Sequence, residues 1–592
     1  MEKLLAIRKT VVYIEREKGG FAMIKDVFLI FKTHLDIGFT DYAENVKEKY
    51  LTQYIPNAIA TARQLQGTDT PFVWTVGSWL IREALKRDDG TLEQAIRDGL
   101  IRWHALPFTT HTEFMTPELF EEGLKISKEL DQRFGMETHG AKMTDVPGHT
   151  VAMLPLLEKY GVQFLHIGVN GASMPPDVPP LFVWEKDGHR VVVACNGGGY
   201  GGQTEAGESL FLFAHTLDNM GAQSAEQIRE IYQKTRQAYP GAQVRCGTME
   251  DFLPRIDVDA LPVITDEIGD SWIHGVATDP YTTAAYRSVL RYAKANRLPI
   301  PEELLMVAEH TWGMDIKTYY PHTDGWFNAE FAADPENPDR KVVEKSWKEQ
   351  REYVFTAARK LDYDVGADMA CAVPTLDGLS TIDHTPGVTL CWQLFCAEDY
   401  RRYEQQYMLR HGLSKWDFTK FGLPEYEGMM AQAKPVAAWQ TEDGYLTQLR
   451  FDPALEEEFG LPAFYVTEAG AQVEVKMVGK APSRLPQALW LKFDSCSGPV
   501  EVSKLGQWID PANARGCKLI MGFDGGIRNS RLEIESLDAA LVAPFGRRLL
   551  EYGVTDLVPE PWFNLYNNIW NTNFPMWFGD DVRFRFVLHD RK

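Results

Sequence analysis

Residues 27–38 read Val-Phe-Leu-Ile-Phe-Lys-Thr-His-Leu-Asp-Ile-Gly, an apolar run that passes directly into a polar motif. The run Val27–Phe31 predicts a buried β-strand. Residues i and i+2 of an extended segment point to the same face, so His34 and Asp36 would project together from the end of that strand. An imidazole beside a carboxylate is a natural start for a zinc site. A buried histidine bonded to a loop carboxylate would give the same triplet, so both interpretations stay open here.

Strand and helix patterns alternate on both sides of this motif, from Lys25 to about Arg297. Residues 116–134 predict a helix, because Thr116 can cap it, Pro117 suits its first turn and its leucines and phenylalanine share one face. Such alternation over about 270 residues indicates an α/β layer or barrel with a mainly parallel sheet. In folds of this kind, chemistry collects at the carboxyl ends of the strands.

The character of the chain changes twice after this region. Helical patterns dominate from Pro301 to about Met430, and short β-like runs separated by Gly, Pro, Asn and Asp recur from Lys434 onward. The latter pattern is typical of an antiparallel sandwich. Met23 precedes the first strand and could be the true start. We therefore predict a multidomain α/β plus α plus β protein, with an extension over 1–22, a barrel-like α/β domain over 23–295, a helical domain over 296–435 and a β-sandwich over 436–592.

Charge and cysteine content exclude several classes of function. There are 61 Lys and Arg against 83 Asp and Glu, a formal net charge of −22, whereas nucleic acids and anionic membranes are bound by clustered cations. No apolar run approaches the roughly 20 residues of a membrane span, and the charged N-terminus does not fit a signal peptide. Seven scattered cysteines without a CxxC motif predict reduced thiols in a cytoplasmic protein.

Three further motifs are rich in groups that can do chemistry. Asp145 lies in Thr144–Thr150, on a turn before a helix, where a carboxylate can reach a cleft or simply cap the helix. His310 stands between Glu309 and Trp312 and could equally be a core residue. Residues 266–275 crowd three carboxylates, an imidazole and an indole into ten positions. That crowding of acids is costly unless cations, a metal or solvent share it.

Together, in this order, the motifs resemble the family-38 α-mannosidases. The first strand of that family ends in H-x-D-x-G, seen here as His34–Gly38, and its nucleophile lies in a turn that resembles Thr144–Thr150. Its last metal ligand is a histidine after the barrel, where His310 stands in this chain. Residues 243–252 and 567–574 also look like family segments, so the resemblance extends in islands from about residue 25 to 590.

The departures indicate a divergent, bacterial-type branch of that family. Val146-Pro147 replaces Pro-Phe in the nucleophile turn, and Thr311 stands where the family has an aspartate. These changes bear on specificity for mannose more than on the fold. The resemblance implies a distorted (β/α) barrel as catalytic domain, a helical bundle and a C-terminal antiparallel β-sandwich.

The resemblance also implies a retaining glycosidase with one divalent ion, zinc by its donor set, held by His34, Asp36, Asp145 and His310. Asp145 would be the nucleophile as well, forming a glycosyl-enzyme intermediate. Asp218 is the best candidate for the acid/base, followed by Asp270 and Glu267. The residues expected to contact the sugar, some by stacking, are Asp270, Trp272, His274, Trp312 and Asn573, with Trp74 and Trp570 as further candidates.

Two other functions fit the same residues. A metal-dependent polysaccharide deacetylase or other amide hydrolase would use similar ligands with water as the nucleophile. A non-catalytic carbohydrate-binding homologue would keep the aromatics and show no turnover, since a fold does not guarantee an activity. The length of the chain and the Asn-Ile-Trp-Asn-Thr-Asn-Phe segment at 568–574 favour the glycosidase. We expect an oligosaccharide or glycoside substrate and no nucleic-acid or membrane partner, and a homo-oligomer is compatible with the sequence.

Overall fold

The computed structural model describes residues 23–408 and 420–591, so the extension expected over 1–22 lies outside the described residues. The chain divides into two compact units. The first unit holds the described residues up to Thr110 together with Glu121–Pro147 and Met153–Thr265. The second unit holds His111–Phe120, Gly148–Ala152 and the described residues from Asp266 onward.

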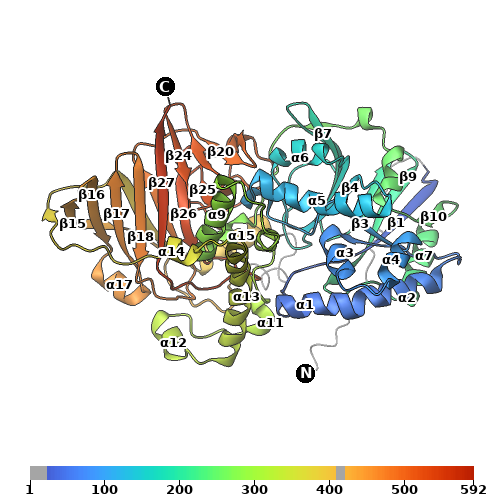
Figure 1. Cartoon of the computed structure of the whole chain (residues 1–592), viewed down its shortest axis with the longest axis horizontal. Coiled ribbons are helices and arrows are strands. Elements are labelled where there is room, and N and C mark those ends of the chain that lie inside the picture. Colours follow the sequence, from blue (N-terminus) through green and yellow to red (C-terminus); the bar gives the residue numbers. More distant parts are fainter. Residues whose placement is uncertain (1–22, 409–419, 592) are drawn as a thin grey trace. The chain divides into compact units, whose positions relative to one another are not determined.

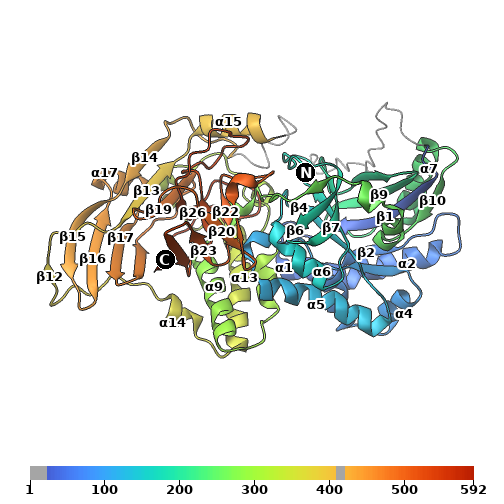
Figure 2. The same ribbon diagram turned by 90° about the horizontal axis from the view of Figure 1, so that it is seen from above.

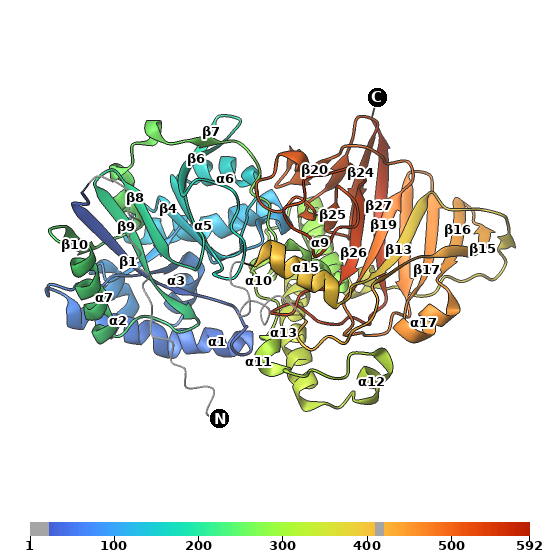
Figure 3. The ribbon, with the colours of Figure 1, turned by 180° about the vertical axis from the view of Figure 1, so that it is seen from behind.

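The first unit contains two mainly parallel sheets (Figures 1 and 3). One has the order β3-β2-β1-β9-β8, with β10 beside β1; the other has the order β11-β6-β7-β5-β4. The strands of the first sheet are β1 Asp26–His34, β2 Trp74–Gly77, β3 Ile101–His104, β8 Gly202–Ala206, β9 Ser209–Asp218 and β10 Gln243–Cys246. Those of the second are β4 Gly140–Asp145, β5 Phe164–Val169, β6 Leu181–Lys186, β7 His189–Asn196 and β11 Val263–Ile264.

Aromatic side chains fill the space between these two sheets. The ring of Phe164 on β5 lies 5.6 Å from that of Phe211 on β9, and both pack against Phe252. Strand β1 is buried along nearly its whole length, as its apolar run predicts. Closure of the two sheets into one barrel stays a prediction.

Helices connect the strands of the first unit. They are α1 Ala43–Lys49, a π-helical turn at Tyr50–Tyr54, α2 Ile55–Leu65, α3 Ser78–Leu85, α4 Thr91–Arg97, α5 Pro117–Phe134, α6 Leu154–Lys159, α7 Ala225–Ala238 and α8 Met249–Phe252. Helix α5 begins at the proline that the sequence places in a first turn, and its buried face includes Leu119, Phe120 and Leu124. None of the described helices is both long and apolar enough to cross a membrane.

The second unit opens with helices. They are α9 Pro280–Ala295, α10 Glu303–Ala308, α11 Ile316–Tyr319, α12 Asn328–Ala333, α13 Pro338–Lys360, α14 Val365–Met369, α15 Ala397–Tyr407 and α17 Pro453–Phe459. Helices α9 and α13 lie side by side (Figures 1 and 2). The buried guanidinium of Arg287 on α9 donates to the backbone oxygens of Phe523 and Ser536. Residues 266–295, which we expected to end the barrel-like domain, lie in the second unit.

Two antiparallel sheets make up the rest of the second unit (Figures 1 and 3). The larger has the order β12-β15-β16-β17-β18-β27-β24-β23-β20-β21: β12 Ser380–Thr381, β15 Lys434–Gln440, β16 Gly444–Arg450, β17 Ala463–Ala469, β18 Gln472–Val478, β20 Glu501–Lys504, β21 Gln507–Ile509, β23 Gly526–Arg528, β24 Leu532–Ser536 and β27 Val582–Asp590. The smaller has the order β14-β13-β19-β26-β25-β22: β13 Val388–Leu394, β14 Met429–Gln432, β19 Gln487–Phe493, β22 Met521–Gly522, β25 Leu541–Ala543 and β26 Trp562–Asn567.

Side chains of the two antiparallel sheets pack against each other. The ring of Phe586 on β27 lies 5.1 Å from Phe493 on β19 and 5.1 Å from Phe563 on β26. Buried residues alternate with more accessible ones along β18 and over Val582–Val587 of β27, which gives each strand one apolar face for this core. The predicted combination of parallel α/β sheets with later antiparallel sheets is confirmed.

Candidate functional site

Three predicted site residues each end a strand of the first unit: His34 on β1, Asp145 on β4 and Asp218 on β9. Strands β1 and β9 pair in parallel, and a register shift after Thr33 sets His34 opposite Asp218. One ligand atom each of His34, Asp36 and Asp218 lies within 4.8 Å of the others. All three side chains are at least partly buried, so the structure gathers a nitrogen and two carboxylate donors at one point.

The ring of His34 is oriented by its neighbours. Its Nε2 lies 3.0 Å from Asp36 Oδ1, and its Nδ1 lies 2.9 Å from the hydroxyl of Thr144 on β4. With a proton on Nδ1 donated to Thr144, the lone pair of Nε2 faces the carboxylates. A histidine whose second nitrogen is held in this way is typical of a metal ligand. The donor set therefore fits a divalent metal.

Asn219 fixes the loop that carries Asp36. Its side-chain oxygen accepts from the Asp36 backbone N–H at 3.0 Å, and its amide nitrogen donates to the backbone oxygens of Asp36 and Gly38, both at 3.1 Å. The same nitrogen donates to the hydroxyl of Thr40 at 2.9 Å. A single buried amide thus holds the backbone of the loop from which the Asp36 carboxylate projects.

Backbone strain gathers at the same place. Phe39, Asp145 and Asn219 all have positive φ, at 62°, 79° and 51°, a region that non-glycine residues adopt rarely. Strained conformations of this kind cost about 1–3 kcal/mol each and cluster at functional sites. Asp145 is further held by Asn170, whose amide donates to Asp145 Oδ1 at 2.7 Å.

Tyr200 covers the imidazole of His34. The two rings stack with centroids 4.2 Å apart, and the Tyr200 hydroxyl donates to Asp218 Oδ1 at 2.6 Å. Burial raises the pKa of Tyr200 well above its ordinary value, and the charges of Asp145 and Asp218 add to this. The tyrosine therefore stays protonated and acts as a hydrogen-bond donor.

A buried lysine holds the glycine-rich segment Asn196–Gln203 that carries Tyr200. Lys142 Nζ donates to the backbone oxygen of Tyr200 at 2.7 Å and lies 2.7 Å from His166 Nδ1. His166 Nε2 in turn lies 2.7 Å from the side-chain oxygen of Asn196. Burial lowers the pKa of Lys142 and of His166 well below their ordinary values, and these two side chains hold both the start and the middle of this segment.

The second unit gathers another set of predicted residues around His310. The Nδ1 atom of His310 lies 2.6 Å from Glu309 Oε1, and the side-chain amide of Asn573 donates to the His310 backbone oxygen at 2.8 Å. The backbone N–H of Trp312 donates to the Asn573 backbone oxygen at 3.1 Å. The segment at 567–574 therefore packs beside His310 and Trp312.

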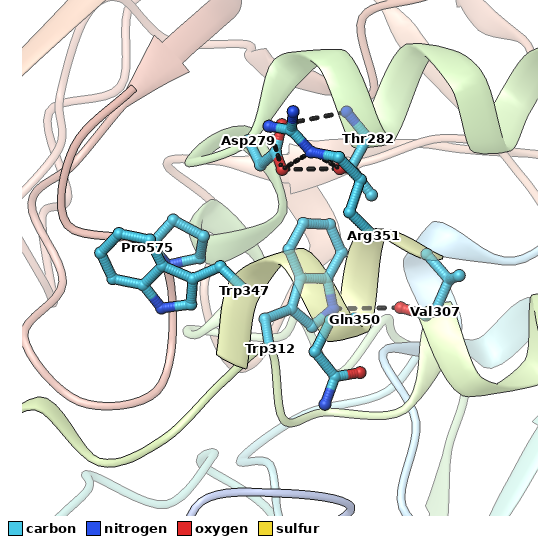
Figure 4. A pocket seen from close by; sticks show the side chains of 8 residues that line it. All are labelled: Asp279, Thr282, Val307, Trp312, Trp347, Gln350, Arg351 and Pro575. Atoms are coloured by element: carbon cyan, nitrogen blue, oxygen red, sulfur yellow. Dashed lines mark hydrogen bonds and ion pairs between the residues drawn. The ribbon is translucent and has the colours of Figure 1, made fainter. Parts of the chain in front are cut away.

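Trp312 borders a small cavity (Figure 4). Its indole N–H donates to the Val307 backbone oxygen at 3.0 Å. The lining residues are Asp279, Thr282, Val307, Trp312, Trp347, Gln350, Arg351 and Pro575. The volume of about 10 Å³ holds at most one water molecule, so this face of the indole packs against protein and has no room for a sugar ring.

Asp270, Trp272 and His274 form a buried group in the same unit. Asp270 Oδ2 lies 2.7 Å from His111 Nδ1, and its other oxygen accepts from the Trp272 backbone N–H at 2.8 Å. The Trp272 indole donates to the Tyr407 hydroxyl at 2.8 Å. The ring of His274 meets that of Trp570 edge-on, with centroids 4.8 Å apart. Both carboxylate oxygens of Asp270 thus already have protein partners.

Glu267 belongs to an ion network centred on Lys504. The ammonium of Lys504 lies 2.9 Å from Glu267 Oε1 and 2.7 Å from Glu113 Oε2, and all three side chains are buried. The second oxygen of Glu267 accepts from the Thr150 hydroxyl and the Val151 backbone N–H. This network supplies the cation that the crowded acids of residues 266–275 require.

Trp74, which was expected to stack on a sugar, is completely buried on β2.

Two solved structures are similar to this chain in fold. An alpha-mannosidase from Enterococcus faecalis V583 matches with a TM-score of 0.59 at 9% identity, over 96% of this chain and 87% of that one. A glycosyl hydrolase family 38 protein from Enterococcus faecalis matches with a TM-score of 0.54 at 8% identity, over 96% and 86%. The chain therefore has a fold like that of these family-38 proteins. Residues 276–386 match a domain of unknown function, DUF5054, and no curated protein matches the chain.

Within this family-38 fold, the predicted site residues divide between the two units. His34, Asp36, Asp145 and Asp218 lie in the first, and Asp270, Trp272, His274, His310, Trp312 and Asn573 lie in the second. Four residues of this group were not predicted from the sequence: Tyr200, Asn219, Asn170 and Lys142. The five glycines among residues 197–202 are a signal that could have drawn attention to Tyr200, whereas nothing local marks Lys142.

The electrostatics of the first group favour a bound cation. Burial raises the pKa of Asp218 to about 6, the Asp36 charge adds to this rise, and His34 opposes it. Carboxylates that share a buried site repel one another unless a positive charge joins them. A divalent ion held by Asp36 and Asp145 would offset the negative charges that act on Asp218.

Proposed function

We propose that this chain is a metal-dependent retaining glycoside hydrolase of the α-mannosidase type, which removes terminal sugar residues from oligosaccharides or glycosides. The convergence of His34, Asp36 and Asp218 at the carboxyl ends of β1 and β9 is the observation that carries the proposal. The family-38 fold supports the assignment to glycosidases.

His34, Asp36, Asp145 and His310 would hold the metal, with zinc the ion that best suits two imidazoles and two carboxylates. His310 enters this set through the family resemblance. The bound ion would supply Lewis-acid coordination of sugar hydroxyls at the cleavage site. Thr144 would keep His34 in the tautomer that presents Nε2, and Asn219 would keep Asp36 in place.

Asp145 and Asp218 would divide the bond-breaking steps. Asp145 would attack the anomeric carbon while Asp218 gives a proton to the departing oxygen; Asp218 would then take a proton from the water that releases the sugar from Asp145. Tyr200 donates to Oδ1 of Asp218, so the proton to be transferred belongs on Oδ2. Asn170 fixes the nucleophile by its bond to Asp145 Oδ1.

The test is hydrolysis of a panel of nitrophenyl glycosides before and after chelation. We expect release of nitrophenol from the α-mannoside, its loss after chelation and its return on addition of zinc. ¹H NMR should show the α-anomer as the first product. Hydrolysis at an unchanged rate after chelation would contradict the need for a metal ion. A β-anomer as the first product would contradict the retaining mechanism.

A metal-dependent deacetylase is the second candidate, because His34, Asp36 and Asp218 could act together as a three-ligand site of the kind that activates water. Acetylated oligosaccharides distinguish the two functions in the same protein. Release of acetate with all glycosidic bonds intact would favour the deacetylase. If the zinc-bound protein hydrolyses none of these substrates, the result would favour a non-catalytic carbohydrate-binding homologue.

A further inference from the structure

A hollow of about 530 Å³ lies on the smaller antiparallel sheet of the second unit. It is formed by Met430 on β14 and by the connection between β25 and β26, and its lining residues are Met430, Phe545, Gly546, Arg547, Arg548, Val558, Pro559 and Glu560. The volume falls within the range of small-molecule sites, about 300–1,000 Å³. We call it the Arg547 hollow.

The connection is held in shape by its own backbone. Phe545 and Glu560 form a parallel bridge, the Gly546 N–H donates to the Glu560 oxygen at 2.9 Å, and the Glu560 N–H donates to the Pro544 oxygen at 2.9 Å. The two ends of the connection are therefore fixed to each other above the paired strands β25 and β26. The walls exist before any ligand binds, which lowers the entropic cost of binding.

Arg547 is positioned as a donor without an acceptor. Its guanidinium stacks 3.9 Å from the ring centre of the buried Trp562, which fixes the orientation of the plane. Its Nε atom is buried and has no hydrogen-bond partner. No described carboxylate forms an ion pair with it, whereas the other charges of the hollow are paired.

The pairing of those other charges is specific. Glu560 forms an ion pair with Lys492 at 3.1 Å, and Arg548 pairs with Asp556 at 3.3 Å and Glu551 at 3.9 Å. Arg547 thus differs from Arg548 in having no carboxylate partner among the described residues, and its guanidinium has the fork geometry that matches a carboxylate. The remaining wall is apolar, and Met430 and Val558 are 47% and 72% exposed.

We propose that the Arg547 hollow binds a hexuronate, either free or as an acidic unit of a glycan. Its carboxylate would accept two hydrogen bonds from the terminal N–H groups of Arg547, and the C–H face of its ring would lie on Met430 and Val558. A neutral hexose would lose the charged interaction, and a small carboxylate such as acetate would lose the apolar contact. The site is independent of the candidate metal centre and of the proposed hydrolysis.

The proposal is tested by isothermal titration calorimetry of the full-length protein with D-glucuronate. D-glucose and acetate are the comparison ligands. We expect glucuronate to bind at least tenfold more tightly than either. Arg547→Met should weaken binding about tenfold or more, because a hydrogen bond to a charged group is worth about 1.5–3 kcal/mol. Arg548→Met, in the same connection but already paired, should change the affinity by less than threefold.

A second variant tests the proposal even if Arg547→Met does not fold. Met430→Glu places a negative charge at the exposed rim without touching the stack of Arg547 on Trp562, and it should weaken glucuronate binding while the thermal unfolding temperature stays the same. Equal binding of glucuronate and glucose, or full affinity in Arg547→Met, would overturn the proposal. Comparison of glucuronate with a glucuronate-containing disaccharide separates a free ligand from a glycan unit, since only the latter gains affinity with length.

Discussion

Asp145 is the residue at which backbone conformation and chemistry meet. It is the last residue of β4, it has positive φ, and Asn170 fixes its carboxylate. The left-handed conformation turns the chain sharply as it leaves the strand. A carboxylate held by both its backbone and a neighbouring amide loses little freedom when it attacks a substrate.

Substitutions of Asp145 and Asp218 should therefore have different kinetic effects. Asp145→Asn should abolish turnover of every glycoside, including those with good leaving groups, and should weaken zinc binding. Asp218→Ala should slow natural oligosaccharides by about 10²–10⁴-fold, because sugar alkoxides need protonation, but should slow nitrophenyl glycosides much less. Steady-state kinetics on both substrate types measures the contrast.

Rescue by azide and a control substitution of another aspartate complete this test. Azide should partly rescue Asp218→Ala by attacking the glycosyl-enzyme, and should not rescue Asp145→Asn. Asp187→Asn is the control, since Asp187 also has positive φ but its side chain is 75% exposed. If Asp218→Ala keeps full activity on oligosaccharides, the acid/base is another group.

The residues that the sequence analysis found, and those that it missed, differ in how local their signals are. His34 and Asp36 are two positions apart at the end of one strand, so a local pattern predicts that they lie together. Asp218 comes to His34 only through the pairing of β9 with β1, which no local pattern encodes. Lys504 lies 237 positions from Glu267, so the sequence shows that the acids need a cation without showing which one.

At the scale of elements, the glycine-rich segment Asn196–Gln203 depends on a side chain from another strand. Lys142→Met keeps the length of the side chain but removes its bonds to Tyr200 and His166. We expect faster amide hydrogen exchange at residues 197–202 and lower glycosidase activity, because Tyr200 would no longer be held over His34. Hydrogen-exchange mass spectrometry measures the first effect. Lys159→Met, on an exposed lysine, should leave the exchange of these residues unchanged; equal exchange in both variants would show that Lys142 does not hold the segment.

A buried lysine in the second unit should make stability depend on pH. Lys480 Nζ donates to the backbone oxygens of Ala481 and Phe578 and lies over the Tyr566 ring, and burial lowers its pKa from 10.5 to about 7. Its folded-state pKa is below the unfolded value, so its contribution is present above pH 10.5 and is lost as pH falls towards 7. Each pKa unit corresponds to about 1.4 kcal/mol.

Denaturant unfolding of Lys480→Met at several pH values measures this effect. Relative to the variant, the unmodified protein should lose stability by up to a few kcal/mol between pH 10 and pH 7, with a constant difference below pH 6. Lys341→Met, on an exposed side chain, should show no such trend. A pH-independent difference for Lys480→Met would contradict the lowered pKa.

At the scale of the whole molecule, the Lys504 network joins segments that are distant in sequence. Lys504→Met would leave Glu113 and Glu267 buried without a cation, which should lower the free energy of unfolding by about 3–5 kcal/mol. Adding Glu267→Gln should restore part of that loss, since it removes one of the two unpaired charges. Chemical denaturation of the single and double variants gives both values, and additive losses would show that the residues do not interact.

The chain crosses between its two units after residues 110, 120, 147, 152 and 265. Residues 111–120 and 148–152 are therefore synthesised long before most of the second unit, to which they belong. The Gly522 N–H that bonds to Glu113 is 409 positions further along, and at about 5–20 residues per second the ribosome needs some 20–80 seconds to reach it. For nearly all of that interval Glu113 lacks both the Lys504 ammonium and the Gly522 N–H, although the Asp270 N–H that also bonds to it is synthesised earlier. Nascent chains should accordingly need chaperones until the last sheet has been synthesised. When residues 1–265 and 266–592 are expressed as separate fragments, neither should fold alone.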